Sequence, residues 1–264
     1  LTFFIPSAFG FGGQSYWGFM PFTDYPNYMG IIILILAIVG LTQKRNPIHW
    51  FFIATSLLAL FISFGKHFSL IYDLFYNIFP YFNKFRVPHM ILILLQFNIS
   101  ILAAFGIDKL IDLKGQVSPR WFWFILSFIG LFLIALTLGN PFVESTVRSH
   151  FSLLRNQNPG IVEAVNNLRW NLWLNDAWMM ILISGAFLGL IWLWIQQKIS
   201  KIYFLILTSI LAIADIFIVD YKIMNPSKNS GRNSQLISNR VVDKYFSKDE
   251  IIDFLTSDKT DFRI

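Results

Sequence analysis

The chain has 264 residues, of which 55% are hydrophobic and only 14% charged, and its formal net charge is +6. A soluble domain usually carries about a quarter charged residues, so this composition argues against a water-soluble globular protein. Most Lys and Arg residues lie in short segments between apolar runs, which excludes a continuous basic surface for nucleic acid.

Six apolar segments are long enough, or nearly so, to cross a bilayer as α-helices. A hydrocarbon core needs roughly 20 mostly apolar residues per helix, and several of these segments are flanked by Trp or Tyr, which favour membrane interfaces. The predicted fold class is therefore all-α: a polytopic bundle of about six transmembrane helices with interfacial helices and a short polar C-terminal tail. An outer loop of residues 1–24 is expected to precede a bundle of residues 25–220. The predicted spans are residues 25–41, 48–64, 87–107, 121–138, 177–195 and 202–219.

The connections between these spans alternate in charge. Three are short and rich in Lys and Arg: residues 42–47, 108–120 and 196–201. Two are longer and sparser in charge: residues 65–86 and 139–176. Basic residues next to spans stay in the cytoplasm, so the three short connections are predicted to be cytoplasmic. The long loops and both ends of the chain are then extracytoplasmic.

Both long loops carry amphipathic patterns. Residues 68–79 mix apolar with polar side chains and predict a helix lying in the membrane interface. In the second loop, residues 143–154 place apolar side chains at helical spacing, and residues 161–172 repeat the pattern after the turn at Pro159. We therefore expect two helices in the second loop. One interpretation is that these helices rest on the membrane or cap the bundle. The alternative is that they form the wall of an outward-facing cavity.

The composition changes after the sixth span. Residues 225–239 are rich in Ser, Asn, Lys and Gly and predict a flexible linker. Ser247 and Glu250 have the spacing of a capping box and predict a short helix. Residues 221–264 are thus expected to be a linker and the start of a soluble extracytoplasmic domain. Because Leu1 opens no signal-peptide pattern and the chain stops soon after this helix, we expect an internal part of a larger protein.

Polar residues inside the spans are few. Asp215 lies about one turn inside the end of the sixth span, where a carboxylate is either functional or simply close enough to the boundary to reach water. We interpret it as a structural or accessory group. Gln96, Asn98 and Ser100 in the third span are expected to form hydrogen bonds with neighbouring helices. The sequence has no Cys, no phosphate-binding loop and no zinc-ligand spacing, so we expect neither a metal nor a cofactor.

The junction before the third span concentrates cations among aromatic residues. Lys84, Arg86 and His89 lie near the start of a helix, where the positive end of the dipole disfavours them unless an anion is present. A lipid phosphate or pyrophosphate is the anion we expect, because helix N–H groups would also bind it. The alternative is that these side chains are ordinary anchors at phospholipid headgroups.

Several short motifs resemble the YfhO-like bacterial membrane proteins. The run Phe85-Arg86-Val87-Pro88 is followed by an apolar span that ends in residues 103–108, Ala-Ala-Phe-Gly-Ile-Asp. Trp17-Gly18 and Tyr28-Met29-Gly30 precede the first span, and Ala214-Asp215 closes the last. The resemblance extends over most of the chain, roughly residues 13–264. It implies that the chain corresponds to the C-terminal part of the membrane region of such proteins.

This resemblance implies a glycosyltransferase of the GT-C type in the bacterial inner membrane. Such enzymes transfer a sugar from a polyprenyl-phosphate carrier to an envelope glycolipid or polymer, and their catalytic carboxylate generally lies in the first outer loop, upstream of this chain. The implied partners are membrane lipids and the polyprenyl-phosphate-linked sugar, held at Lys84, Arg86 and His89. The alternatives are a transporter or flippase-like protein for a lipid-linked substrate, or a non-enzymatic scaffold for envelope assembly. The absence of Pro inside the spans counts against a transporter with broken helices.

Overall fold

The computed structural model describes most of the first 224 residues, and the part described is largely helical. The described ranges are residues 2–10, 15–18, 26–42, 47–65, 69–82, 88–112, 120–137, 140–151 and 159–224. The chain divides into two compact units, Leu1–Val219 and Asp220–Ile264. In the second unit only the last residues of a helix are described, so the predicted linker and capped tail helix lie outside the described residues.

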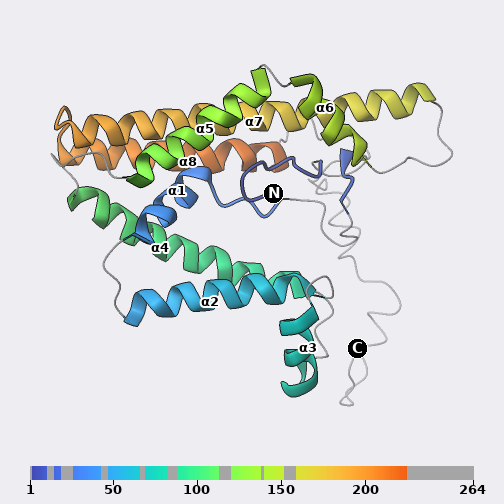
Figure 1. Ribbon diagram of the computed structural model, residues 1–264, viewed down its shortest axis with the longest axis horizontal. Helices are drawn as coiled ribbons and strands as arrows, with labels where there is room; N and C mark the ends of the chain where they lie inside the picture. The colour runs from blue at the N-terminus through green and yellow to red at the C-terminus, as the bar shows by residue number, and fades with distance from the viewer. Residues whose placement is uncertain are drawn as a thin grey trace, which may run out of the picture. The chain divides into compact units, whose positions relative to one another are not determined.

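The described elements follow one another as helices, and none of them is a β-strand. They are α1 (Ile31–Gly40), α2 (Pro47–Ser63), α3 (Ser69–Ile78), the 3₁₀ turn η4 (Pro88–Ile91), α4 (Leu92–Asp112), α5 (Arg120–Thr137), α6 (Asn140–Ser149), α7 (Pro159–Ile195) and α8 (Lys201–Met224) (Figure 1). The all-α prediction is therefore confirmed for this part of the chain.

The number of complete membrane spans is smaller than predicted. Among the described residues, three helices are long and apolar enough to cross a bilayer: His89–Asp112, Pro159–Ile195 and Lys201–Lys222. Helix α5 counts as part of a fourth span only if it is combined with α6. The two helices meet at an angle of 88°. Helices α1 and α2 have 10 and 17 residues. Because a span needs roughly 20 residues, the prediction of about six full spans is not confirmed.

Helix α7 corrects the predicted organisation of the second long loop. We expected a loop helix over residues 161–172 and a separate span over residues 177–195. The structure instead has one continuous helix of 37 residues. At 1.5 Å per residue it is about 55 Å long, whereas the hydrocarbon core is only about 30 Å thick. The first part of α7 therefore extends beyond the apolar layer. The other predicted loop helices correspond to α3 and α6.

Helix α1 is the most enclosed element of the bundle. It is apolar on all sides, and eight of its ten residues are buried. It crosses α4 with almost no space between the two backbones. A Cβ atom at Gly106 would lie 1.9 Å from the Leu36 carbonyl oxygen, and one at Gly40 would lie 2.1 Å from that of Leu102. Small residues at such crossings are typical of membrane helices, because close backbone approach replaces the hydrophobic driving force.

Among the described residues, side-chain hydrogen bonds connect α4 to α2 and to α7. Asn98 Nδ2 donates to Thr55 Oγ1 of α2 at 2.9 Å, as expected for a polar residue inside a span. Trp194 Nε1 in α7 donates to the Leu110 carbonyl at 2.7 Å. Ser100 differs from the expectation, because its hydroxyl donates to the Gln96 carbonyl of its own helix. Helix α4 thus holds α2 on one side and α7 on another.

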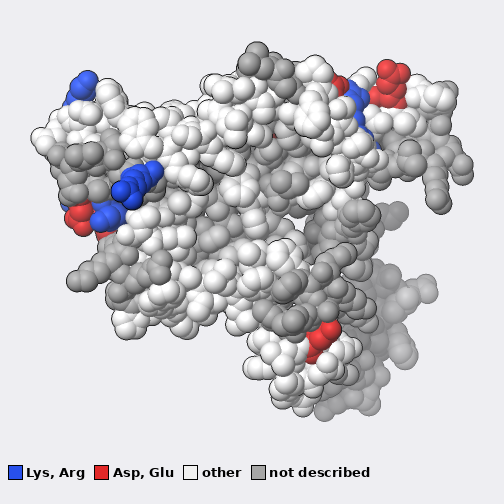
Figure 2. All heavy atoms as spheres, in the orientation of Figure 1, with Lys and Arg blue, Asp and Glu red and all other residues white. Residues whose placement is uncertain are grey.

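The helix ends joined by the three basic connections lie together, on the left of Figure 1. They are the end of α1 and start of α2, the end of α4 and start of α5, and the end of α7 and start of α8. Lys and Arg side chains gather over this end of the bundle in Figure 2. We call it the basic end. Basic residues on one side of successive helices are what the positive-inside rule requires of cytoplasmic connections.

This topology predicts the accessibility of introduced cysteines. The chain has no native Cys, so single labelling sites are clean. A Cys at Gln197, in the turn between α7 and α8, should react with an impermeant maleimide only after the membrane is permeabilised. A Cys at His150, after α6, should react in intact cells. The reverse pattern would show that the orientation is inverted.

Candidate functional site

Asp215 connects α8 to the beginning of α1. Its side chain is 1% exposed, and Oδ2 accepts a hydrogen bond from the Ile32 N–H at 3.4 Å. The first N–H groups of a helix have no partner within it, and the residue before α1 is Gly30, which has no side chain to cap them. A carboxylate is also favoured by the positive end of the helix dipole. Asp215 therefore caps α1 from another helix.

Gly30 is required by this arrangement. Its φ is +95°, a conformation that residues with a side chain rarely adopt. A Cβ atom at this position would also lie 3.1 Å from Asp215 Oδ2. A side chain there would disturb both the turn into α1 and the capping carboxylate.

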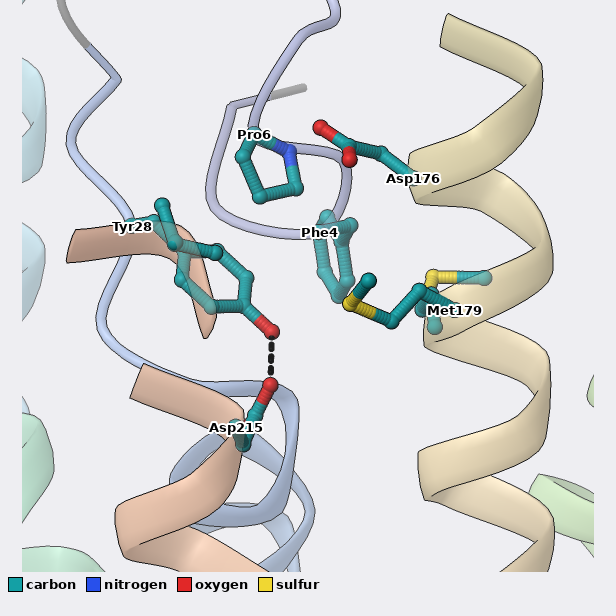
Figure 3. Close-up of a pocket in the computed structure, with 8 residues that line it drawn as sticks. Phe4, Pro6, Tyr28, Asp176, Met179 and Asp215 are labelled. Atoms are coloured by element: carbon teal, nitrogen blue, oxygen red, sulfur yellow. Dashed lines mark hydrogen bonds between the residues drawn. The ribbon is translucent and has the colours of Figure 1, made fainter. Parts of the chain in front are cut away.

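Tyr28 is the second partner of Asp215. Its hydroxyl donates to Asp215 Oδ1 at 2.6 Å (Figure 3). The same hydroxyl accepts the Ile31 N–H at 3.1 Å. Tyr28 lies in the non-helical segment before α1.

His89 lies next to the same segment. It belongs to η4 at the start of α4, and its Nε2 is 2.6 Å from Asn27 Nδ2. The Asn27 amide and the His89 imidazole thus form a hydrogen bond, in which the donor and the acceptor depend on the imidazole tautomer. The consecutive residues Asn27 and Tyr28 therefore bring together two site residues that the sequence predicted, His89 and Asp215.

The other two predicted binding residues are not placed. Lys84 and Arg86 lie outside the described residues, so their convergence with His89 stays a prediction. Sequence reasoning missed Asn27 and Tyr28 as partners. Tyr28 was noted only within a family-like motif, and nothing in its local sequence indicates that it contacts a residue of the last span.

A second buried carboxylate, Asp176 in α7, holds the N-terminal segment. It is 2% exposed, and its Oδ2 accepts the Ser7 N–H at 2.9 Å and the Ser7 hydroxyl at 2.5 Å. Two turns earlier on α7, the buried Arg169 donates from Nε to the Ser15 carbonyl at 3.1 Å and from Nη2 to the Tyr16 carbonyl at 3.3 Å. One face of α7 thus binds the N-terminal segment at two places, Ser7 and Ser15–Tyr16. In the sequence, the two-turn spacing of Arg169 and Asp176 could have indicated that both side chains lie on one face of a helix.

Asp176 and Asp215 line one small cavity. Its other walls come from Phe4, Pro6, Tyr28, Met179, Met180 and Val219 (Figure 3). The volume is about 10 Å³, which is close to the space that one water molecule occupies. A sugar or a lipid headgroup does not fit there. Across the described ranges, no three His, Asp or Glu side chains are grouped so that they could hold a metal ion.

Comparison with known proteins gives no relative for this chain. No family model matches it, and neither a curated protein nor a solved structure shows significant similarity.

Proposed function

We propose that this chain is the C-terminal part of the membrane region of a GT-C-type glycosyltransferase, similar to the YfhO-like proteins. In this proposal the end of the bundle opposite the basic end binds the phosphate of a polyprenyl-phosphate-linked sugar. The observation that supports it is the position of His89. This side chain lies at the start of the span His89–Asp112, next to Asn27, whereas the basic connections join the other ends of the helices.

The start of α4 suits an anion for two reasons. Helix N–H groups are available at such an end, and the dipole favours negative charge. The His89 imidazole adds a ring nitrogen that can carry a further N–H donor. Arg86 is three residues earlier, and three residues span at most about 11 Å. This separation is short enough for its guanidinium and His89 to contact the same phosphate.

The contacts around Asp215 support this site without touching the lipid. Tyr28 is fixed by Asp215 and by the N–H of Ile31. Asn27 is the preceding residue, and its amide lies beside His89 Nε2. Asp215 and Tyr28 are positioning residues in this proposal, and the catalytic carboxylate is expected upstream of the chain.

The test is carrier binding by the full-length parent protein in nanodiscs. A charge-assisted hydrogen bond is typically worth about 1.5–3 kcal/mol, so Arg86→Ala should weaken polyprenyl-phosphate binding roughly tenfold or more. Arg86→Lys should restore only part of the affinity, because a point charge cannot reproduce the bidentate fork. Arg120→Ala, at the basic end, is the matched control and should leave binding unchanged.

Two results would contradict the proposal. Equal binding by wild type, Arg86→Ala and Arg86→Lys would make Arg86 a membrane anchor only. Movement of the lipid-linked sugar across a vesicle membrane, with no transfer to an acceptor, would favour the transporter or flippase-like alternative.

A further inference from the structure

An apolar groove runs along the outside of α7 and α8, away from the site described above. Its volume is about 530 Å³, within the range of roughly 300–1,000 Å³ that ligand sites occupy. All its lining residues are apolar. They include Ala186, Gly189 and Trp192 of α7 and Leu207, Ile210 and Leu211 of α8. Trp192 is 40% exposed and Ile210 56% exposed, so the described residues leave the groove open.

The groove exists because α7 has small residues on this face. Gly189 has no side chain, and a Cβ atom added there would meet no other atom within 4 Å. Ala186, about one turn earlier, adds only a methyl group. Small residues in membrane helices usually admit a neighbouring helix. Here no described helix enters the space beside Gly189.

A cation lies at one end of this groove. Trp192 is close to the end of α7, and Lys198 Nζ is 4.9 Å from the centroid of its ring. Lys201, the first residue of α8, is exposed in the same connection. From Trp192 the groove continues to Ala186, about 9 Å further along the helix. Positive charge, an interfacial aromatic ring and an apolar channel therefore follow one another from the membrane surface inward.

We propose that this groove binds one acyl chain of an anionic phospholipid whose phosphate contacts Lys198. The ammonium group has three donors, so it can contact a phosphate while it lies over the Trp192 ring. The basic end is the predicted cytoplasmic side, where anionic lipids are concentrated. Free phosphate has no tail to fill the groove, and a zwitterionic lipid has no net charge for Lys198. This site is separate from the proposed carrier site, which lies at the start of α4.

The experiment uses the whole chain in nanodiscs that contain phosphatidylglycerol with a photoreactive acyl chain. Crosslinks are mapped by mass spectrometry to residues 186–193 and 207–211. Gly189→Leu fills the groove and should reduce crosslinking there at least fivefold. Gly130→Leu is the matched control, because a Cβ at Gly130 also meets nothing within 4 Å and α5 does not line the groove. It should crosslink at the wild-type level.

The headgroup part is tested separately. Lys198→Ala should reduce crosslinking by phosphatidylglycerol severalfold but leave that by phosphatidylcholine unchanged, and Lys198→Arg should restore it. Equal labelling of wild type and Gly189→Leu would overturn the proposal, and so would equal use of both lipids by wild type. Neither result depends on carrier binding at Arg86, so the two proposals succeed or fail independently.

Discussion

Replacing Gly106 by alanine should destabilise the bundle by about 1–3 kcal/mol, because the crossing of α1 and α4 has no room for a methyl group. The added Cβ would lie 1.9 Å from the Leu36 carbonyl oxygen. That oxygen belongs to the backbone of a buried helix and cannot rotate away as a flexible side chain could. The two helices must move apart, and α1 then loses packing along its length.

The measurement is the free energy of unfolding in mixed micelles, obtained by titration with a denaturing detergent. Gly130→Ala is the matched control. A Cβ at Gly130 meets nothing within 4 Å, so this change should be neutral or stabilise the helix by roughly 0.5–1 kcal/mol, which is the usual cost of a glycine in a helix. If Gly106→Ala and Gly130→Ala unfold alike, α1 and α4 do not cross as described.

Removing the Asp215 carboxylate should be comparably damaging. In Asp215→Ala, the Tyr28 hydroxyl and the Ile32 N–H both lose their acceptor in a buried site. An unsatisfied buried group costs about 1–3 kcal/mol, so the two groups together should lower the free energy of unfolding by about 2–6 kcal/mol. Asp215→Asn keeps one acceptor oxygen and should lose about half as much.

A double-mutant cycle with Tyr28→Phe measures the contact itself. If the hydroxyl and the carboxylate act as a pair, the two changes together should cost less than the sum of the separate costs, by about 1 kcal/mol. Asp220→Ala is the control in the same helix; its side chain is exposed, and the change should stay within about 0.5 kcal/mol of wild type. Additive effects of Tyr28→Phe and Asp215→Ala would show that capping of α1 by Asp215 does not depend on the tyrosine.

The continuity of α7 shows where local patterns mislead. Asn175 and Asp176 interrupt the apolar run and suggested a boundary between a loop helix and a span. Polarity by itself does not end a helix, however, and neither residue is Pro or Gly. Asp176 is tolerated inside the helix because Ser7 supplies its hydrogen bonds. The burial of Asp176 within α7 therefore depends on a contact with the distant N-terminal segment.

The sequence by itself determined the helical class, the membrane-like composition and the grouping of basic residues at alternate connections. These properties depend on residues close together in the chain, through hydropathy, helical period and charge. Only the tertiary structure decided that Asn27 and Tyr28 join His89 to Asp215, and that Gly40 and Gly106 let α1 meet α4. Those contacts arise between residues far apart in the sequence. They are selected by how whole helices pack and by the need of each buried polar group for a partner.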